Sequence, residues 1–332
     1  MARRIGERET SGPTRGARGR ARRALAALLV GMLLVPLLAA CGGAVGGAGD
    51  IAKRKVKVTT TVGMITDVVR NVGGERVEVT GLMGPGVDPH LYKPSASDTQ
   101  KLEGADIIFY GGLELEGRMT DLLVKLARSG KRAVPVTEEI PEDKLREPAE
   151  FEGKFDPHVW FDVTLWQVAV RTINAQLAEL DPDSKVLYQR NTDAYLKQLD
   201  ELHGYTKAQI ASIPQGSRVL ITAHDAFGYF GQQYGMEVRG LQGTSTATEA
   251  SAADVQALST FIVDRKIKAI FVESSVPKAT IEAVQAAVKS KGWDVAIGGE
   301  LFGDAMGNDG TPEGTYVGMV RHNVNTIVKA MK

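Results

Sequence analysis

The sequence predicts an α/β protein of two lobes, each with a parallel-rich sheet flanked by helices, joined by one long rigid α-helix. Two observations lead to this fold class. From residue 55 onward, short runs rich in Val and Ile alternate with amphipathic stretches, which is typical of parallel sheets covered by helices. Residues 183–213, between two halves of similar character, follow a helical pattern instead. A chain of 332 residues is long enough for two domains with substantial cores.

Seven runs predict the strands, at residues 56–61, 77–82, 106–110, 132–136, 218–222, 269–273 and 294–297. Amphipathic segments such as 119–128 and 252–265 lie between them. No internal repeat of 20–50 residues is evident. We therefore expect a first lobe over residues 55–182 and a second over residues 214–332.

The predicted linking helix covers residues 183–213. Pro182 stands where helices begin and Pro214 where they end. An uninterrupted helix of this length spans roughly 45 Å, although Gly204 weakens the helical preference near its middle. Between two α/β units such a helix indicates a rigid connection. The alternative is that it packs within a single domain.

The N-terminus has the layout of an export signal. Residues 1–40 contain eight Arg and two Glu, a net +6, so the rest of the neutral chain carries −6. The apolar run of residues 24–40 follows the basic block and ends in Leu-Ala-Ala-Cys, which resembles a bacterial lipobox. We expect residues 1–40 to be removed, Cys41 to be lipidated and residues 41–54 to form a flexible tether. A plain secretory signal and an uncleaved anchor are the alternatives.

Several kinds of chemistry are excluded by the composition and by missing motifs. Cys41 is the sole cysteine, so disulfides and thiolate ligands are ruled out and any metal must be bound by nitrogen and oxygen. The sequence has no phosphate-binding loop, no HExxH, no GxSxG and no CxxC. Since no basic cluster follows the leader, nucleic acid is not an expected partner. Any ATP hydrolysis must come from another chain.

Three of the five histidines follow predicted strands or stiff turns. His90 and His158 each end an Asp-Pro-His triplet, and His224 follows the strand at 218–222. Ligands bind near the carboxyl ends of parallel strands, and proline presents the next side chain from a rigid turn. One such triplet would suggest a solvent-exposed turn. Two triplets with a third strand-end histidine favour a metal site.

A fourth ligand is expected from a carboxylate, because three imidazoles leave one tetrahedral position open. Asp304 and Glu300 lie just beyond the strand predicted at 294–297, and Glu273 ends another predicted strand. Spacing places Asp304 slightly ahead of Glu300, with Glu273 as a third ligand candidate or an outer-sphere group.

The other histidines and the tryptophans are expected to have structural positions. His203 lies among charged residues of the predicted linking helix, where we expect a solvated face. His322 lies in a predicted C-terminal helix at 316–331 and is also expected to bind no metal. Packing roles are expected for Trp160, Trp166 and Trp293.

At this point the motifs resemble those of the TroA-like zinc/manganese-binding solute receptors of ABC importers. The resemblance extends from residue 56 to the C-terminus. It rests on GPGVDPHLY at 84–92, DPHVWFD at 156–162, TAHDAFGYF at 222–230, LQGTSTATEA at 241–250, FVESS at 271–275 and GELFGDAM at 299–306. Each motif alone is weak evidence, but the ordered set is specific.

The resemblance implies two α/β lobes with the metal buried between them. Carried over by position, the ligands are His90 and His158 from the first lobe and His224 and Asp304 from the second, which selects Asp304 over Glu300. It also implies a monomeric, extracytoplasmic lipoprotein anchored through the lipid on Cys41. Zn²⁺ or Mn²⁺ is the implied cargo, passed to an ABC permease and its ATPase subunit.

Two departures from the family pattern keep zinc and manganese both in consideration. Residues 138–152 are acidic but lack the histidines that many zinc receptors carry there, and His224 stands where manganese receptors often have Glu. Three imidazoles and one carboxylate favour zinc over manganese in affinity. Because neutral imidazoles are needed, we expect affinity to fall below about pH 6.5.

Other functions have weaker support in the sequence. A secreted zinc hydrolase needs an open coordination position, which four protein ligands do not leave. A receptor for iron, haem or a siderophore needs a wide apolar or basic cleft, and 6% aromatic residues give that little support. An adhesin role has no specific sequence feature behind it.

Overall fold

The computed structural model describes residues 51–151 and 153–332. The predicted signal peptide, Cys41 and most of the tether lie outside the described residues. Ile51 is buried, and its carbonyl accepts a 2.6 Å hydrogen bond from Arg76, so contact with the fold begins a few residues before the expected start at 55. Within the described part of the chain, every helix is too short or too polar to cross a bilayer.

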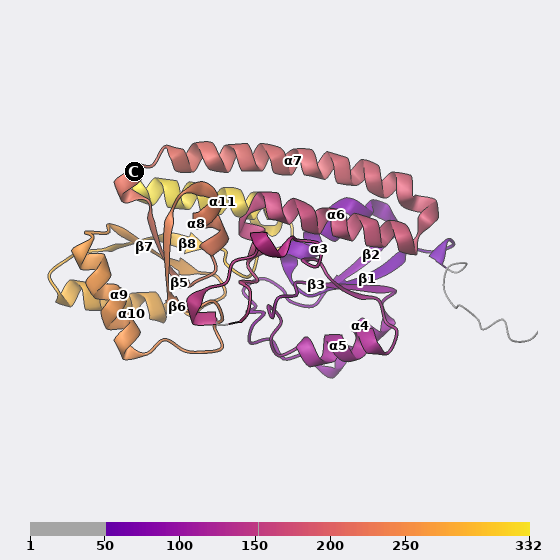
Figure 1. Cartoon of the computed structure of the whole chain (residues 1–332), viewed down its shortest axis with the longest axis horizontal. Coiled ribbons are helices and arrows are strands. Elements are labelled where there is room, and N and C mark those ends of the chain that lie inside the picture. The colour runs from indigo at the N-terminus through magenta and orange to yellow at the C-terminus, as the bar shows by residue number, and fades with distance from the viewer. Residues whose placement is uncertain (1–50, 152) are drawn as a thin grey trace, which may run out of the picture. The chain divides into compact units, whose positions relative to one another are not determined.

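The first half of the chain forms a parallel sheet of four strands in the order β2-β1-β3-β4 (Figure 1). The strands are β1 (Val56–Thr60), β2 (Val77–Gly81), β3 (Ile107–Tyr110) and β4 (Ala133–Pro135). The associated helices are α3 (Gly63–Gly73), α4 (Ala96–Gly104), α5 (Thr120–Arg128) and α6 (Val163–Leu180). Helix α4 begins at a capping box in which Ser95 and Asp98 satisfy each other's backbone N–H groups.

The second half contains two pairs of parallel strands. β5 (Val219–His224) pairs with β6 (Glu237–Gln242), and β7 (Ala269–Glu273) pairs with β8 (Ala296–Leu301). The helices here are α8 (Gly228–Tyr234), α9 (Ala252–Asp264), α10 (Ala279–Ser290) and α11 (Tyr316–Met331). Parallel pairing throughout confirms the predicted fold class.

The largest differences from the sequence prediction concern β6 and β8, although β5 also ends two residues later than predicted and includes His224. β6 was missed because Arg239, Gly240 and Gln242 interrupt its apolar pattern; Gly240 is required there, since a Cβ would lie 2.4 Å from the backbone nitrogen of Asp225. β8 begins and ends later than predicted and runs through the glycines at 298 and 299, which suggested a turn. Glu300 therefore lies inside a strand rather than in the following loop.

Helix α7 (Lys185–Ala211) is the predicted linking helix and continues unbroken through Gly204. It follows a short 3-10 turn at Pro182–Ser184. α7 packs against α3 and α6 from the first half and against α8 and α11 from the second (Figure 1). Its buried side chains recur every three or four residues and so form one face: Tyr188, Thr192, Tyr195, Leu199, Leu202, Thr206 and Ile210.

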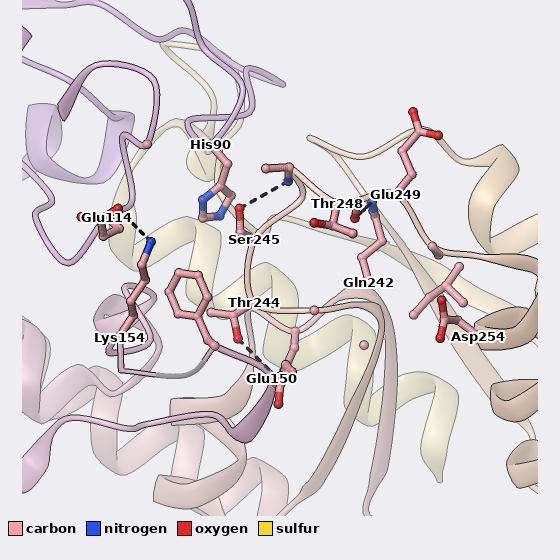
Figure 2. A pocket seen from close by; sticks show the side chains of 18 of the residues that line it. His90, Glu114, Glu150, Lys154, Gln242, Thr244, Ser245, Thr248, Glu249 and Asp254 are labelled. Carbon is pink, nitrogen blue, oxygen red and sulfur yellow. Dashed lines mark hydrogen bonds and ion pairs between the residues drawn. The ribbon is translucent and has the colours of Figure 1, made fainter. Parts of the chain in front are cut away.

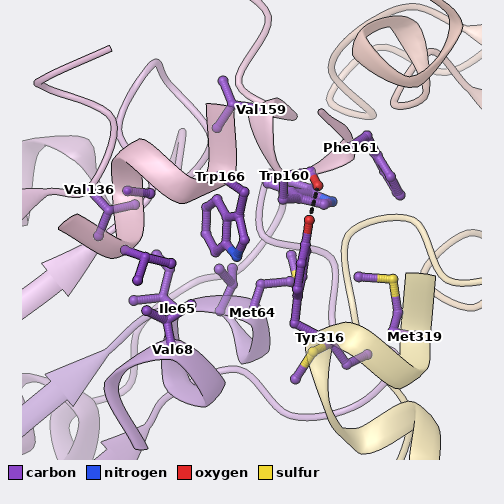
Figure 3. Packing of buried hydrophobic residues seen from close by; sticks show 14 of the residues in the cluster. Met64, Ile65, Val68, Val136, Val159, Trp160, Phe161, Trp166, Tyr316 and Met319 are labelled. Atoms are coloured by element: carbon purple, nitrogen blue, oxygen red, sulfur yellow. Dashed lines mark hydrogen bonds between the residues drawn. The ribbon is translucent and has the colours of Figure 1, made fainter. Parts of the chain in front are cut away.

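The main hydrophobic core is continuous between the two halves near Tyr316 (Figure 3). Tyr316 begins α11 yet packs against Trp166 of α6, with ring centroids 5.6 Å apart. Its hydroxyl donates a 2.7 Å hydrogen bond to the carbonyl of Trp160. Trp160 and Trp166 are both buried, as expected. Because this packing joins α11 to the first half, the two halves share a core and not merely a linker.

A buried carboxylate strengthens the same junction. Asp67 of α3 accepts hydrogen bonds from the Tyr195 hydroxyl of α7 at 2.9 Å and from the Tyr316 backbone nitrogen of α11 at 3.1 Å. Burial raises the pKa of Asp67 even though these donors favour its ionised form. Three helices from different parts of the chain are thus tied to one side chain.

Candidate metal centre

Four buried side chains from distant parts of the sequence converge on one point. His90 lies in the loop after β2, His158 stands just before the 3-10 turn Val159–Phe161, His224 is the last residue of β5, and Asp304 follows β8. Each offers one ligand atom, and these atoms all lie within 4.8 Å of one another. Each side chain is no more than 3% exposed. These are the four residues selected in the sequence.

The separations match those expected around a single ion. His158 Nε2 lies 3.2 Å from Asp304 Oδ1, and His224 Nε2 lies 3.2 Å from Asp304 Oδ2. His90 Nε2 lies 3.3 Å from His158 Nε2 and 3.5 Å from Asp304 Oδ2. Four atoms placed tetrahedrally at zinc-ligand bond lengths are about 3.4 Å apart. The site can therefore enclose one small cation.

Both Asp-Pro-His turns have the same local construction. The Asp88 carboxylate accepts a 2.8 Å hydrogen bond from the His90 backbone nitrogen, and Asp156 accepts one of 2.9 Å from His158. Each aspartate thus closes a small turn over its proline. In both places the Asp-Pro-His triplet therefore presents its imidazole from a turn that is rigid by itself.

Two carboxylates contact imidazole rings on the side away from the centre. Asp156 Oδ1 lies 2.7 Å from His158 Nδ1, and Glu273 Oε2 lies 2.9 Å from His224 Nδ1. With a metal ion bound, we assign the one remaining proton of each imidazole to Nδ1, facing its carboxylate, which leaves the lone pair of Nε2 for the ion. Glu273, one of the ligand candidates from the sequence, therefore supports His224 from the outer sphere.

Arg146 supports the carboxylate behind His158, a contact that sequence reasoning missed. Its guanidinium forms an ion pair with Asp156 Oδ2 and lies over the ring of Tyr229 in α8, 5.6 Å from the centroid. The Tyr229 hydroxyl accepts from the Arg146 backbone nitrogen and donates to the Asp156 carbonyl, each at 3.0 Å. The orientation of His158 thus depends on contacts with the second half of the molecule. In the sequence Arg146 had no distinguishing signal within an acidic stretch.

The remaining candidates are placed elsewhere. Glu300 pairs with Lys278 at 2.8 Å, away from the four converging atoms. His322 Nε2 lies 3.0 Å from the Glu300 carbonyl. The charged neighbours of His203 predicted a solvated face, but the residue is partly buried. Its Nδ1 lies 3.2 Å from the Tyr234 hydroxyl.

The carboxylates around the site control the protonation of its imidazoles. Burial alone would lower the pKa of His158, but Asp304 and Asp156 outweigh it and raise that pKa to about 9. The pKa of His224 is likewise raised well above its usual value, by Glu273 and Asp304 against the effect of burial. Among the residues that the structure describes, no carboxylate pairs with Nδ1 of His90, and burial lowers the pKa of this histidine to about 3.

The acceptor groups at the centre are suited to a cation. Burial alone would raise the pKa of Asp304, but His224 and His158 hold it well below its usual range, so the carboxylate is ionised. Among the described residues, neither of its two buried oxygens finds a well-directed hydrogen-bond partner, and the same is true of His224 Nε2. Buried polar atoms normally find partners. His224 Nε2 and the two Asp304 oxygens converge on a common point, which is the arrangement that a metal ion requires.

Comparison with known proteins identifies the family. Residues 58–330 match the model of the family described as ZnuA, zinc-uptake complex component A, periplasmic. The chain belongs to this family. This result confirms the class of protein to which the sequence motifs pointed, a transport receptor for metal ions.

Relatives of this ZnuA-family chain are similar over most of their lengths. It is 48% identical to the manganese-binding lipoprotein MntA of Bacillus subtilis, over 92% of this chain and 99% of the relative. It is 50% identical to the zinc-binding protein TroA of Treponema pallidum, over 87% of this chain and 92% of that one. The solved structure of the Treponema pallidum protein superposes with a TM-score of 0.82 at 51% identity, covering 83% of this chain and 99% of that chain.

Proposed function

We propose that this protein is an extracytoplasmic solute-binding lipoprotein that captures Zn²⁺ and/or Mn²⁺ and delivers it to an ABC importer. The proposed ligands are His90, His158, His224 and Asp304. The observation that carries the proposal is the convergence of their ligand atoms within 4.8 Å, all buried and drawn from both halves of the chain. Ligands from both halves couple capture of the ion to the arrangement of the lobes, which a permease can recognise.

The proposed cellular context follows from the leader and from the relatives. Cleavage before Cys41 and lipidation of its thiol would anchor the protein to the membrane by its N-terminus, and the Bacillus subtilis relative is named a lipoprotein. The proposed partners are an ABC permease and its ATPase subunit, because the chain carries no phosphate-binding loop of its own. We propose that it acts as a monomer.

A binding role without catalysis is the proposal that fits the donor set. Four protein ligands fill a tetrahedral shell and leave no position for an activated water, which a zinc hydrolase needs. Ligand atoms within 4.8 Å of one another also enclose a single ion and leave no space among them for haem or a siderophore. A transport receptor has to hold its cargo and then release it unchanged.

The two candidate metals differ in the coordination they prefer. Three imidazoles with one carboxylate favour zinc in the Irving–Williams order. Manganese prefers more oxygen donors, and both Asp304 oxygens lie close to imidazole nitrogens, so that bidentate binding can supply a fifth donor. We propose that zinc binds more tightly in vitro and that either ion is the cargo in the cell.

The proposal is tested by titration calorimetry of the purified mature protein with Zn²⁺ and Mn²⁺ in competition, after elemental analysis. His224→Ala should weaken binding of either ion by orders of magnitude, because it removes one of four donors. The matched control is His203→Ala, a partly buried histidine outside the centre, which should leave affinity unchanged. Equal effects of the two substitutions would refute the assignment, and tighter binding of Mn²⁺ would reverse the ranking.

A further inference from the structure

A large cavity adjoins the metal centre on the side of His90 (Figure 2). Its volume is about 780 Å³, and it is lined by residues of both halves of the chain, including His90 itself. A cation with six waters of hydration occupies roughly 180 Å³ at about 30 Å³ per water. The cavity can therefore hold a fully hydrated ion. The centre, with its ligand atoms within 4.8 Å of one another, cannot.

His90 differs from the other two imidazoles in a way that suits a first contact. Nδ1 of His158 and Nδ1 of His224 each face a carboxylate, whereas no hydrogen bond to His90 Nδ1 is found among the residues that the structure describes. His90 is held through its backbone nitrogen, by Asp88. Its ring is consequently the least constrained of the three, and it is the one that lines the cavity.

The residues that line the cavity include more acidic than basic side chains. Four of its carboxylates, those of Glu114, Glu150, Glu249 and Asp254, are exposed, and Glu114 is already paired with Lys154 at 3.2 Å. Altogether the lining includes five carboxylates and three basic side chains: Glu114, Glu150, Asp225, Glu249 and Asp254, with Arg118, Lys154 and Arg239. This excess of negative charge attracts a divalent cation and repels an anionic chelate.

A loop of the second half reaches across the cavity to the first half. Residues 243–250 follow β6, and the Thr246 hydroxyl donates a 2.6 Å hydrogen bond to Asp88, the residue that holds His90. Two residues earlier, the Thr244 hydroxyl lies 3.5 Å from Glu150 of the first half. Ser245, Thr248 and Glu249 of the same loop are among the residues that line the cavity (Figure 2).

We propose that this cavity is the entry chamber of the receptor, in which a hydrated divalent cation is held before it sheds water and makes its first bond to His90. The inference rests on the proposed function, because it assumes that the four-residue centre binds the ion. The carboxylates that line the cavity attract the hydrated ion, and His90 is the first residue to bind it. His158, His224 and Asp304 then complete its coordination.

Association and dissociation rates of Zn²⁺ test the route separately from the affinity. Trp160 lies edge-on to His158, with ring centroids 5.2 Å apart, so its fluorescence should report arrival of the ion in stopped-flow experiments. Glu150→Gln and Glu249→Gln should each slow association about threefold at low salt, the effect of removing one charge about 10 Å from a divalent ion. Dissociation should not change, and the difference should disappear at high salt.

Matched substitutions locate the entrance. Glu75→Gln removes an exposed carboxylate that does not line the cavity and should have no effect on association. A second cavity, of about 390 Å³, is lined by Glu300 and Glu313. If Glu300→Gln and Glu313→Gln slow association while the Glu150 and Glu249 variants behave like Glu75→Gln, the ion enters from that second cavity and the proposal is wrong.

An obstruction gives an independent test. Ala247 is exposed in the loop over the cavity, and Ala247→Trp should slow association and dissociation by the same factor without changing the dissociation constant, because it narrows a route used in both directions. Ala127→Trp, on the exposed surface of α5, is the control, and a zinc-sensitive dye replaces tryptophan fluorescence for both. Unchanged rates in Ala247→Trp would overturn the route. Failure of the unmodified protein to bind either Zn²⁺ or Mn²⁺ at equilibrium would instead refute the proposed function.

Discussion

His158 and His224 direct the same nitrogen to the same point, but the protein holds them by different means. The carboxylate behind His224 comes from Glu273, at the end of β7, and contacts both its ring and its backbone nitrogen. The carboxylate behind His158 comes from Asp156, two residues away in the same turn. Asp156 in turn depends on Arg146, which is docked on Tyr229 of α8.

This difference assigns different roles to the two halves of the site. The support of His224 is complete within the second half, since β5 and β7 both belong to it. The support of His158 requires residues of both halves, because the Arg146 side chain lies against α8. We infer that His224 is preorganised for the ion regardless of how the halves are arranged, whereas His158 is fully positioned only when they are in contact.

The largest expected effect is the dependence of affinity on pH. In the metal-free protein the pKa of His158 is raised to about 9 and that of His224 well above 6.5, so both imidazoles hold a proton on Nε2 at neutral pH. The ion must displace these protons, so affinity falls as pH falls, by about tenfold per pH unit for each proton displaced. The fall should begin near pH 9, above the value of 6.5 expected from an isolated imidazole.

Calorimetry in buffers of different ionisation enthalpy measures the proton release directly. His90, with a pKa lowered to about 3, should release none above pH 5. An affinity that is constant from pH 9 to pH 7 would show that the neighbouring carboxylates do not hold protons on His158 and His224.

The next effect compares the two supporting carboxylates. Glu273→Gln and Asp156→Asn keep size and shape but replace an acceptor with an amide, and outer-sphere changes of this kind typically cost 10- to 100-fold in metal affinity. We expect Glu273→Gln to act mainly on the dissociation rate, because the second half alone positions His224. Asp156→Asn should also release Arg146 from its ion pair, so it should reduce the coupling of the halves as well.

Stopped-flow kinetics and small-angle scattering of both variants separate these outcomes. Glu300→Gln is the control, since that carboxylate pairs with Lys278 outside the centre. If both supporting carboxylates gave the same kinetic signature and the same scattering profile, the distinction between the two histidines would be lost.

The three converging histidines could be selected from the sequence because local chemistry marks them. Asp-Pro-His closes its own turn, so it can be recognised from three adjacent letters wherever it occurs. Strand ends are also visible as the end of an apolar run, which placed His224. Asp304 was distinguished from Glu300 by family resemblance and not by spacing, and the structure explains why spacing was insufficient: β8 continues through two glycines, which leaves Glu300 in the strand with its side chain paired to Lys278.

The residues that sequence reasoning missed act through contacts between distant segments. Arg146 and Asp156 are ten residues apart and share no periodic pattern, and Tyr229 is a further 73 residues from Asp156. Nothing in a single sequence indicates that these side chains meet, because the meeting depends on how the halves pack. β6 was missed for a related reason: Gly240 is dictated by the close approach of the backbone at His224 and Asp225, not by strand propensity.

The smallest expected effect comes from moving Arg146 without changing it. Gly228, the first residue of α8, lies directly beneath the guanidinium, and a Cβ there would be 1.2 Å from Arg146 Nη1. Because the obstructed group is the end of a flexible side chain, Gly228→Ala should displace the guanidinium from Asp156 while α8 stays folded. His158 then keeps Asp156, and the Tyr229 hydroxyl can still bond the Asp156 carbonyl, but the ion pair between Arg146 and Asp156 is lost. We expect metal affinity to fall by less than tenfold, at the lower end of the range for outer-sphere changes.

The pattern of combined substitutions distinguishes this mechanism from a general loss of packing. Arg146→Ala should have a similar effect, and the double variant should be no worse than either single one, because both remove the same interaction. Gly204→Ala is the matched control: its Cβ would meet nothing within 4 Å, so it should stabilise α7 by up to about 1 kcal/mol and leave affinity unchanged. Additive losses in the double variant would mean that Gly228 and Arg146 act independently. The position of His158 would then not depend on contact with the second half, as we infer for His224.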